Sequence, residues 1–146
     1  MKHILATDGS AKMIKIAQDK AAAAKIENIT FETTTIDDFT PEKETYDVVM
    51  GMSILHLVKN KEAVFKKVQD MLKPGGVFIS STACLGNTSV FVTLLAKVSG
   101  LVGLVLRPFT PEELKASLVE AGFEIDHEWL PDGEGVKAVF IVAKKV

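Results

Sequence analysis

The sequence is poor in several features, and each scarcity argues against a class of protein. Among 146 residues there is a single cysteine, Cys84. A disulfide framework and a cysteine-rich metal site are therefore excluded, and a reducing compartment is expected. No set of His, Asp or Glu stands at the spacing of metal ligands, so we expect no metal. The formal net charge of −2 offers no basic surface for nucleic acid or an anionic membrane.

Long apolar runs are also scarce. The one that needs attention is 90–106, which falls short of the about 20 apolar residues of a membrane-spanning helix. It is interrupted by Lys97, Gly100 and Gly103, so we expect a lid or a buried helix and no membrane partner. Residues 1–7 lack the apolar core of a signal peptide. A cytoplasmic location is therefore predicted.

What the sequence does have is a regular alternation of short apolar segments and amphipathic helical ones. This alternation predicts one α/β domain over 1–146 with a mainly parallel sheet. The predicted strands are 4–7, 29–36, 46–50, 77–82, 123–129 and 137–143. The last two are joined by a short turn-rich connection, which makes them an antiparallel hairpin.

Three helix starts can be identified from capping residues. They are Ser10, Asn60 and Thr110, the last with Glu113 at the capping-box position. The helix after Asn60 is expected to reach Lys73, and Pro74-Gly75-Gly76 predicts a turn before the next strand. The residues expected on the inward faces are Met13, Ile16, Ala17, Ala21 and Ala24 of the first helix, Val64, Phe65, Val68, Met71 and Leu72 of the second, and Leu114, Leu118 and Ala121 of the third.

Asp8 is the most informative single residue. It follows the apolar strand 4–7 and precedes Gly9-Ser10 and a helix. An acidic residue at this point of a nucleotide-binding βαβ unit accepts hydrogen bonds from both ribose hydroxyls. An aspartate before a helix also has a purely structural use, because it complements the helix dipole. We favour the ribose-binding interpretation.

Taken in order, several motifs resemble those of the class I S-adenosylmethionine (SAM)-dependent methyltransferases. The motifs are Ala6-Thr7-Asp8-Gly9-Ser10, Tyr46-Asp47-Val48-Val49, Leu55-His56, Leu72-Lys73-Pro74-Gly75-Gly76, Thr110-Pro111-Glu112-Glu113 and Ala121-Gly122-Phe123. The resemblance implies a Rossmann-like sheet of strand order 3-2-1-4-5-7-6, in which the C-terminal hairpin is antiparallel. It also implies that SAM lies across the carboxyl ends of the strands.

The same resemblance implies a set of cofactor-binding residues. Asp8 would bind the ribose, Gly9 and Met13 would border the adenosine, Thr35 and Ile36 would contact the adenine, and Gly51 and Met52 would meet the methionine part. Thr35 departs from the family, which often has an acidic residue there. Asp37 and Asp38 follow it and could compensate.

The largest departure is that the family's first strand and its glycine-rich loop have no counterpart. The one Gly-x-Gly, at Gly133-Glu134-Gly135, lies between the last two predicted strands. A βα unit of about 30 residues is therefore expected to be missing. The strands that would flank it must pair directly, 4–7 with 46–50, or pair with another chain, so a homodimer is expected and SAM binding by this chain alone should be weak.

The function implied is methyl transfer from SAM to a small, apolar molecule, whose pocket 90–106 would shape, with the isolated chain impaired. His56 is a weak candidate for a general base, against the simpler interpretation of a polar surface residue. A second hypothesis is a non-catalytic, methyltransferase-like interaction or regulatory module. A third, a nicotinamide-dependent oxidoreductase, is disfavoured by the terminal hairpin and by Pro74-Gly75-Gly76.

Overall fold

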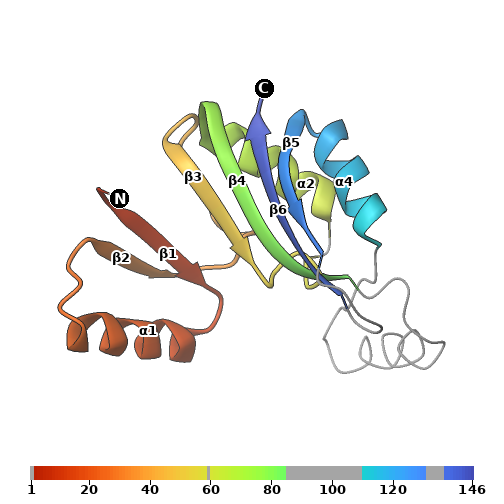
Figure 1. The fold of residues 1–146 in the computed structure, drawn as a ribbon. Helices are drawn as coiled ribbons and strands as arrows, with labels where there is room; N and C mark the ends of the chain where they lie inside the picture. Colours follow the sequence, from red (N-terminus) through yellow and green to blue (C-terminus); the bar gives the residue numbers. More distant parts are fainter. Residues whose placement is uncertain (1, 59, 85–109, 131–136) are drawn as a thin grey trace. The chain divides into compact units, whose positions relative to one another are not determined.

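The structure, a computed structural model, describes residues 2–58, 60–84, 110–130 and 137–146 (Figure 1). It divides into two compact units, Met1–Thr40 and Pro41–Val146, here called the first and second unit. That they form a single domain stays a prediction. The segment 90–106, expected to be a lid or buried helix, lies outside the described residues, as does Gly133-Glu134-Gly135.

The first unit is a βαβ arrangement of β1 (Ile4–Asp8), α1 (Ala11–Ala23) and β2 (Ile29–Thr33). The two strands are parallel, with Ile4 opposite Ile29 and Asp8 opposite Thr33. Ser10 caps α1 as predicted, its hydroxyl accepting from the Met13 amide at 3.4 Å. β2 ends before the predicted Ile36, because the chain turns at Thr35.

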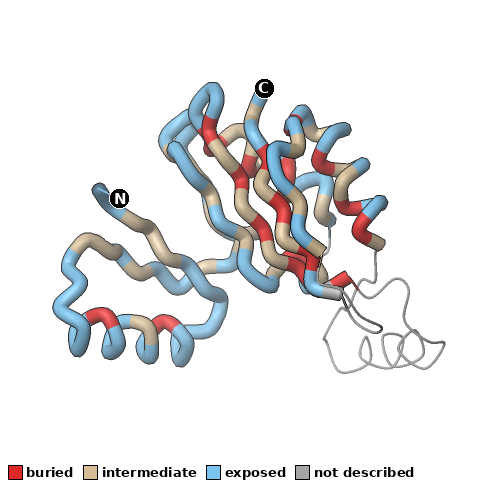
Figure 2. Tube along the Cα trace, viewed as in Figure 1, coloured by how far each residue is buried: buried red, intermediate tan, exposed pale blue. Residues whose placement is uncertain are grey.

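The predicted inward face of α1 is partly wrong. Ile14 and Ala21 are its buried residues (Figure 2), whereas Met13 and Ile16 are 52% and 40% exposed. Ile14 and Ala21 lie seven positions apart and share a stripe of the helix. Because many neighbouring positions are alanine, the sequence of α1 does not fix the phase of this stripe.

The second unit is built on a four-stranded sheet of order β3-β4-β6-β5. Its elements are β3 (Tyr46–Met52), α2 (Lys61–Met71), β4 (Leu72–Cys84), α4 (Pro111–Glu120), β5 (Phe123–Trp129) and β6 (Lys137–Lys145). β3 and β4 are parallel, and β6 runs antiparallel to both β4 and β5. The Rossmann-like fold with a C-terminal antiparallel hairpin is thereby confirmed.

β1 and β3 belong to different sheets. They also lie in separate units, so the direct pairing of strand 4–7 with strand 46–50 stays a prediction. Within its own unit, each of these two strands pairs with its sequence neighbour in a parallel ladder.

One face of the second sheet carries the core. The helices α2 and α4 lie on this face (Figure 1), and Phe65, Leu114, Leu118 and Ile141 are fully buried beneath or within them. Phe78 joins the two ends of this core, because its ring lies 6.2 Å from that of Phe65 and 5.9 Å from that of Phe123. Such aromatic pairs add to the burial of apolar area.

The predicted turn at Pro74-Gly75-Gly76 is instead an irregularity inside β4. α2 ends at Met71, short of the predicted Lys73, and β4 begins at once with Leu72. Tyr46 pairs with Leu72 and Val48 with Val77, so the extra residues of β4 bulge out of the ladder. Gly75 adopts a φ of +73° there, a conformation that glycine tolerates.

A second bulge interrupts the side-chain alternation of β5. The register shifts between Ile125 and His127, so the strict alternation of faces that begins at Phe123 ends at Ile125. Trp129 is exposed, and Glu128 is turned toward α4 instead, where it accepts from Lys115 at 3.0 Å. A bulge of one residue reverses the side-chain alternation that follows it.

Lys145 ties the C-terminal end of the chain to the end of α2. Its ammonium donates to the carbonyl oxygens of Gln69 and Leu72, both at 2.7 Å. These are carbonyls that the end of a helix leaves without intrahelical partners. The contact therefore fixes the junction between α2 and β4.

We predict that Lys145→Met lowers the free energy of unfolding by about 2–3 kcal/mol, because two charge-assisted hydrogen bonds are lost and two carbonyls are left unpaired. Urea denaturation followed by circular dichroism measures the change. Lys144→Met is the matched control, since Lys144 is exposed, and it should shift stability by less than about 0.5 kcal/mol. Equal effects of the two substitutions would contradict the assignment.

Candidate functional site

Asp8 stands at the carboxyl end of β1, where the chain turns into α1. Its Oδ1 accepts a hydrogen bond from the Ser10 amide at 2.7 Å, and its own carbonyl accepts from the Thr34 amide at 3.2 Å. The side chain is exposed. One carboxylate oxygen thus holds the turn, and the carboxylate keeps further lone pairs for another hydrogen-bond donor.

Gly9 brings the turn after β1 against the turn after β2. A Cβ atom added at Gly9 would come within 3.1 Å of Thr35 Cγ2, closer than most real contacts of a Cβ atom. The backbone at Gly9 and the side chain of Thr35 therefore touch without room for a methyl group between them. Three of the residues identified from the sequence, Asp8, Gly9 and Thr35, are brought together here.

Thr35 organises the turn that follows β2. Its hydroxyl donates to Asp38 Oδ2 at 2.6 Å and accepts from the Asp38 amide at 3.2 Å. The Phe39 amide donates to the Thr35 carbonyl at 2.9 Å. The side chain of Thr35 has no carboxylate, but this geometry holds that of Asp38 beside it. Ile36 is half-buried and Asp37 is exposed in the same turn.

Met13 lies in the first turn of α1, three residues beyond the cap, and its side chain is largely exposed. The sequence placed it both on the inward face of the helix and beside the adenosine. The first placement is wrong, and the second stays a prediction. An exposed, flexible thioether next to the Asp8 turn is available to a ligand.

Gly51 and Met52 form the carboxyl end of β3, in the second unit. A Cβ atom at Gly51 would lie 3.3 Å from the ring of Phe78, so packing alone already favours glycine there. Met52 is exposed. The next residue, Ser53, has a φ of +54° and donates its amide to the Ser81 carbonyl at 2.7 Å.

Ser53 is a feature that sequence reasoning missed. A left-handed conformation in a residue other than glycine is sparsely populated, and such residues gather at functional sites. No sequence signal marks it, because serine is compatible with many conformations. It turns the backbone at the carboxyl end of β3, where the parallel strands of this fold class bind their ligands.

His56 follows the same turn and is half-buried. Its Nδ1 is buried and has no hydrogen-bond partner. Burial lowers the pKa of His56 below the ordinary value of 6.5, because desolvation disfavours the charged imidazolium. The imidazole is therefore neutral at pH 7.

We predict that protonation of His56 lowers the free energy of unfolding at acidic pH. The pKa of His56 is lower in the folded than in the unfolded chain, so the unfolded chain binds more protons. The free energy of unfolding therefore falls as the pH drops below 6.5. NMR titration of the imidazole should give a midpoint below that value. His56→Asn should reduce the difference in unfolding free energy between pH 7 and pH 5, and an unchanged difference would contradict the assignment.

Two further features limit the chemistry of the described residues. Within them, no group of three or more His, Cys, Asp or Glu could hold a metal ion. The Cys84 thiol is buried, and burial together with the charge of Glu112 raises its pKa to about 11, so it is a poor nucleophile.

Every helix that the structure describes is too short or too polar to span a lipid bilayer.

Comparison with known proteins decides the family. A family model described as a methyltransferase domain matches residues 1–125. The chain belongs to this methyltransferase family. The arsenite methyltransferase of Halobacterium salinarum is 32% identical over 124 residues, which are 84% of this chain and 31% of that protein. A ubiquinone biosynthesis O-methyltransferase of Rhizobium johnstonii is 26% identical over 128 residues, 84% of this chain and 51% of that one.

Solved structures of methyltransferases share this fold. A crystal structure of a SAM-dependent methyltransferase from Mesorhizobium loti superposes with a TM-score of 0.78 at 21% identity, covering 99% of this methyltransferase chain and 81% of the other. The class I SAM-dependent family, with SAM as its cofactor, is thereby confirmed. The chain spans between about a third and a half of the length of the two relatives named above.

We predict energetic coupling between Gly9 and Thr35. Gly9→Ala should lower the free energy of unfolding more when residue 35 is threonine than when it is serine. Serine lacks the methyl group that the new Cβ atom would meet at 3.1 Å. The coupling energy should be about 0.5–1 kcal/mol. Urea denaturation of the two single variants and the double variant measures it, and additive effects would show that the two turns do not touch.

Proposed function

We propose that this chain carries the nucleoside-binding part of a SAM-dependent methyltransferase that acts on a small, apolar acceptor. The observation that carries the proposal is the contact between the Asp8-Gly9 turn and Thr35. It joins a carboxylate, a close backbone approach and a second polar turn at the carboxyl ends of two parallel strands. This is where nucleotides bind in open α/β sheets.

In this proposal Asp8 accepts from the ribose diol while Ser10 holds the carboxylate in place. The turn that Thr35 and Asp38 form meets the adenine. Gly9 and Met13 border the adenosine, and Ile36 contacts the adenine beside Thr35. Gly51 and Met52 meet the methionine part. The absence of a side chain at Gly9 fits a site at which a planar or ribose group must approach the backbone.

When bound, SAM supplies a methyl group on a sulfonium centre that is already a good leaving group. The work left to the protein is to hold the acceptor in line with the methyl group and to exclude water. His56 is our candidate for the group that takes the acceptor's proton, because burial keeps its imidazole neutral and a neutral imidazole can act as a base.

The acceptor is proposed to be apolar because 90–106, the segment expected near it, is apolar.

The isolated chain is proposed to be impaired, because residues 1–146 contain no glycine-rich loop that would donate amides to the methionine part. Each hydrogen bond lost to a charged group is worth about 1.5–3 kcal/mol. Losing two costs roughly two to four decades of affinity.

A calorimetric titration tests both parts of the proposal. The isolated chain should bind SAM more weakly than low-micromolar, and Asp8→Asn should weaken the remaining affinity about tenfold. Asp19→Asn is the matched control, because Asp19 is an exposed aspartate of α1 that pairs with Lys15. Low-micromolar binding by the isolated chain would contradict the impairment, and an Asp8→Asn variant that binds like Asp19→Asn would contradict the site.

The alternative function is a non-catalytic, methyltransferase-like interaction or regulatory module. The missing glycine-rich loop favours it, and it predicts no binding of SAM at any concentration. For either function we propose a cytoplasmic location, because a single reduced cysteine suits a reducing compartment. We also propose that the chain associates as a homodimer.

A further inference from the structure

The turn that follows β2 holds the carboxylate of Asp38 in one place. The Thr35 hydroxyl donates to Asp38 Oδ2 at 2.6 Å and accepts from the Asp38 amide at 3.2 Å. The Phe39 amide closes the turn by donating to the Thr35 carbonyl at 2.9 Å. A hydrogen bond to a charged acceptor is shorter and stronger than one between neutral groups. Thr35 therefore determines where the Asp38 carboxylate lies, although both residues are exposed.

Thr35 uses both branches of its side chain in this arrangement. Its methyl group lies against Gly9, since a Cβ atom added at Gly9 would be 3.1 Å from Thr35 Cγ2. Its hydroxyl bonds to Asp38. A β-branched side chain has few χ1 rotamers, so the contact with Gly9 also sets the direction of the hydroxyl. Serine would lose the first contact and valine the second, whereas threonine carries both groups on one Cβ atom.

Two carboxylates thereby stand at the carboxyl ends of neighbouring parallel strands. Asp8 ends β1 and is the ladder partner of Thr33, which ends β2. The Thr34 amide donates to the Asp8 carbonyl at 3.2 Å, and the next residue, Thr35, holds Asp38. All of these residues belong to the first unit. A ligand that meets both carboxylates must present a hydrogen-bond donor to each, because a carboxylate only accepts.

We infer that Asp38, held in place by Thr35, selects the base of the bound nucleoside. The inference rests on the proposed nucleoside site, in which Asp8 accepts from the ribose diol and the base meets the turn at Thr35. Adenine presents a donor there, its exocyclic amine, and the Asp38 carboxylate accepts from it. Hypoxanthine and guanine carry a carbonyl oxygen at the same ring position, which a carboxylate repels. The site therefore takes adenine nucleosides and rejects those with a carbonyl oxygen at that position.

Thr35 is a positioning residue for this selection. It stands where the resemblance leads one to expect an acidic residue, and it supplies a carboxylate indirectly, through its hydrogen bond to Asp38. That bond assigns the role to Asp38 and not to its neighbour Asp37. The same bonds have a structural use, because they satisfy backbone groups of the turn. The structural use alone predicts a loss of stability on substitution and no change in the choice of base.

Two ligands that differ at the base separate these roles. They are S-adenosylhomocysteine and S-inosylhomocysteine, in which a carbonyl oxygen replaces the amine. Each is titrated into the isotopically labelled full chain, and the NMR signals of the Gly9 and Ser10 amides report binding whichever base is present. The wild-type chain should bind the adenosyl ligand about tenfold more tightly, as one hydrogen bond to a charged group allows.

Substitutions at the two residues should lower this preference by different amounts. Asp38→Asn should bind the two ligands about equally, because an amide can accept from an amine or donate to a carbonyl oxygen. Thr35→Val keeps the shape of threonine and its contact with Gly9 but no longer holds Asp38. Its preference for the adenosyl ligand should fall to about threefold, since the carboxylate must then be ordered when the ligand binds.

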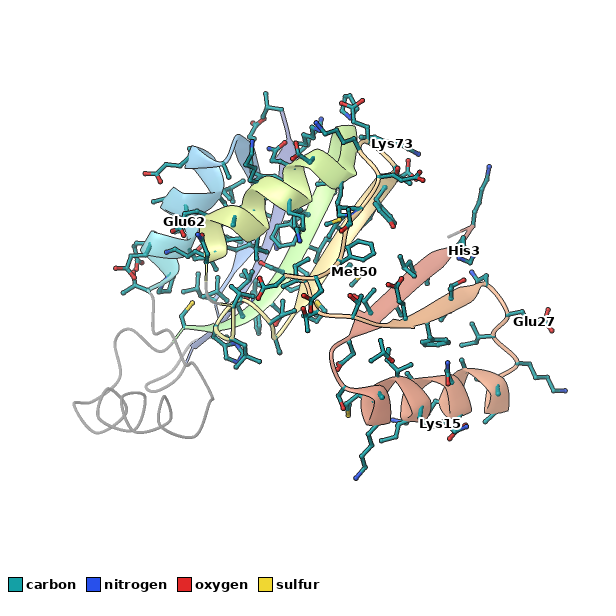
Figure 3. All side chains as sticks on the ribbon, turned by 180° about the vertical axis from the view of Figure 1, so that it is seen from behind. His3, Lys15, Glu27, Met50, Glu62 and Lys73 are labelled. Atoms are coloured by element: carbon teal, nitrogen blue, oxygen red, sulfur yellow. The ribbon has the colours of Figure 1, made fainter. Side chains whose placement is uncertain are left out.

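The matched controls are Asp19→Asn and Thr30→Val. Asp19 is an exposed residue of α1 that pairs with Lys15 at 2.7 Å. The Thr30 hydroxyl lies 3.0 Å from His3 Nε2, and His3 precedes the amino end of β1, whereas the site is at the other end of this strand (Figure 3). Both control variants should keep the preference of the wild type. Circular dichroism melts check that every variant is folded.

The inference and the proposed function can fail separately. Equal affinity of the wild-type chain for both ligands, with both lost in Asp8→Asn, would overturn the inference and leave the proposed function standing. A preference that persists in Asp38→Asn, or one that Asp37→Asn removes instead, would also overturn it. If neither ligand shifts the amides of Gly9 and Ser10 at millimolar concentration, the proposed nucleoside site itself is wrong and the inference falls with it.

Discussion

The parallel pairing of neighbouring strands is the constraint on which the rest of this structure depends. Parallel strands end at the same edge of their sheet. The pairing of β1 with β2 therefore brings the turn at Asp8 and the turn at Thr35 together. In the second unit, the pairing of β3 with β4 places Ser53 where its amide reaches the Ser81 carbonyl. In each unit, the position of these turns is a consequence of the strand register.

The two faces of the second unit's sheet are covered unequally by helices. On one face, α2 and α4 bury a continuous aromatic and aliphatic core that runs from Phe65 through Phe78 to Phe123. On the other face, the methionines of β3 remain exposed.

Local features of the fold could be predicted from the sequence because they depend on neighbouring residues. The caps at Ser10, Asn60 and Thr110 are of this kind, and all three are confirmed, the last as a full capping box with Glu113. The antiparallel pairing of β5 with β6 could also be predicted, because the connection between these two strands is short.

Features that depend on distant contacts could not be predicted. The bulge at Gly75 follows from how β4 pairs with β3, and the reversed faces of β5 follow from how it pairs with β6. In the candidate site, the sequence identified Asp8, Gly9 and Thr35 one at a time. It gave no sign that Gly9 touches Thr35 or that Ser53 is left-handed, because both depend on where two separate turns meet.

The central claim is that the turns after β1 and β2 bind the nucleoside of SAM. Two-dimensional NMR of the isotopically labelled chain, titrated with SAM into the millimolar range, measures this most directly. The account predicts that the amides of Gly9, Ser10 and Asp38 shift together along one binding curve, since Ser10 bonds to the Asp8 carboxylate and Asp38 to Thr35. Amides of these three residues that stay fixed while others shift, or a spectrum without change, would contradict it.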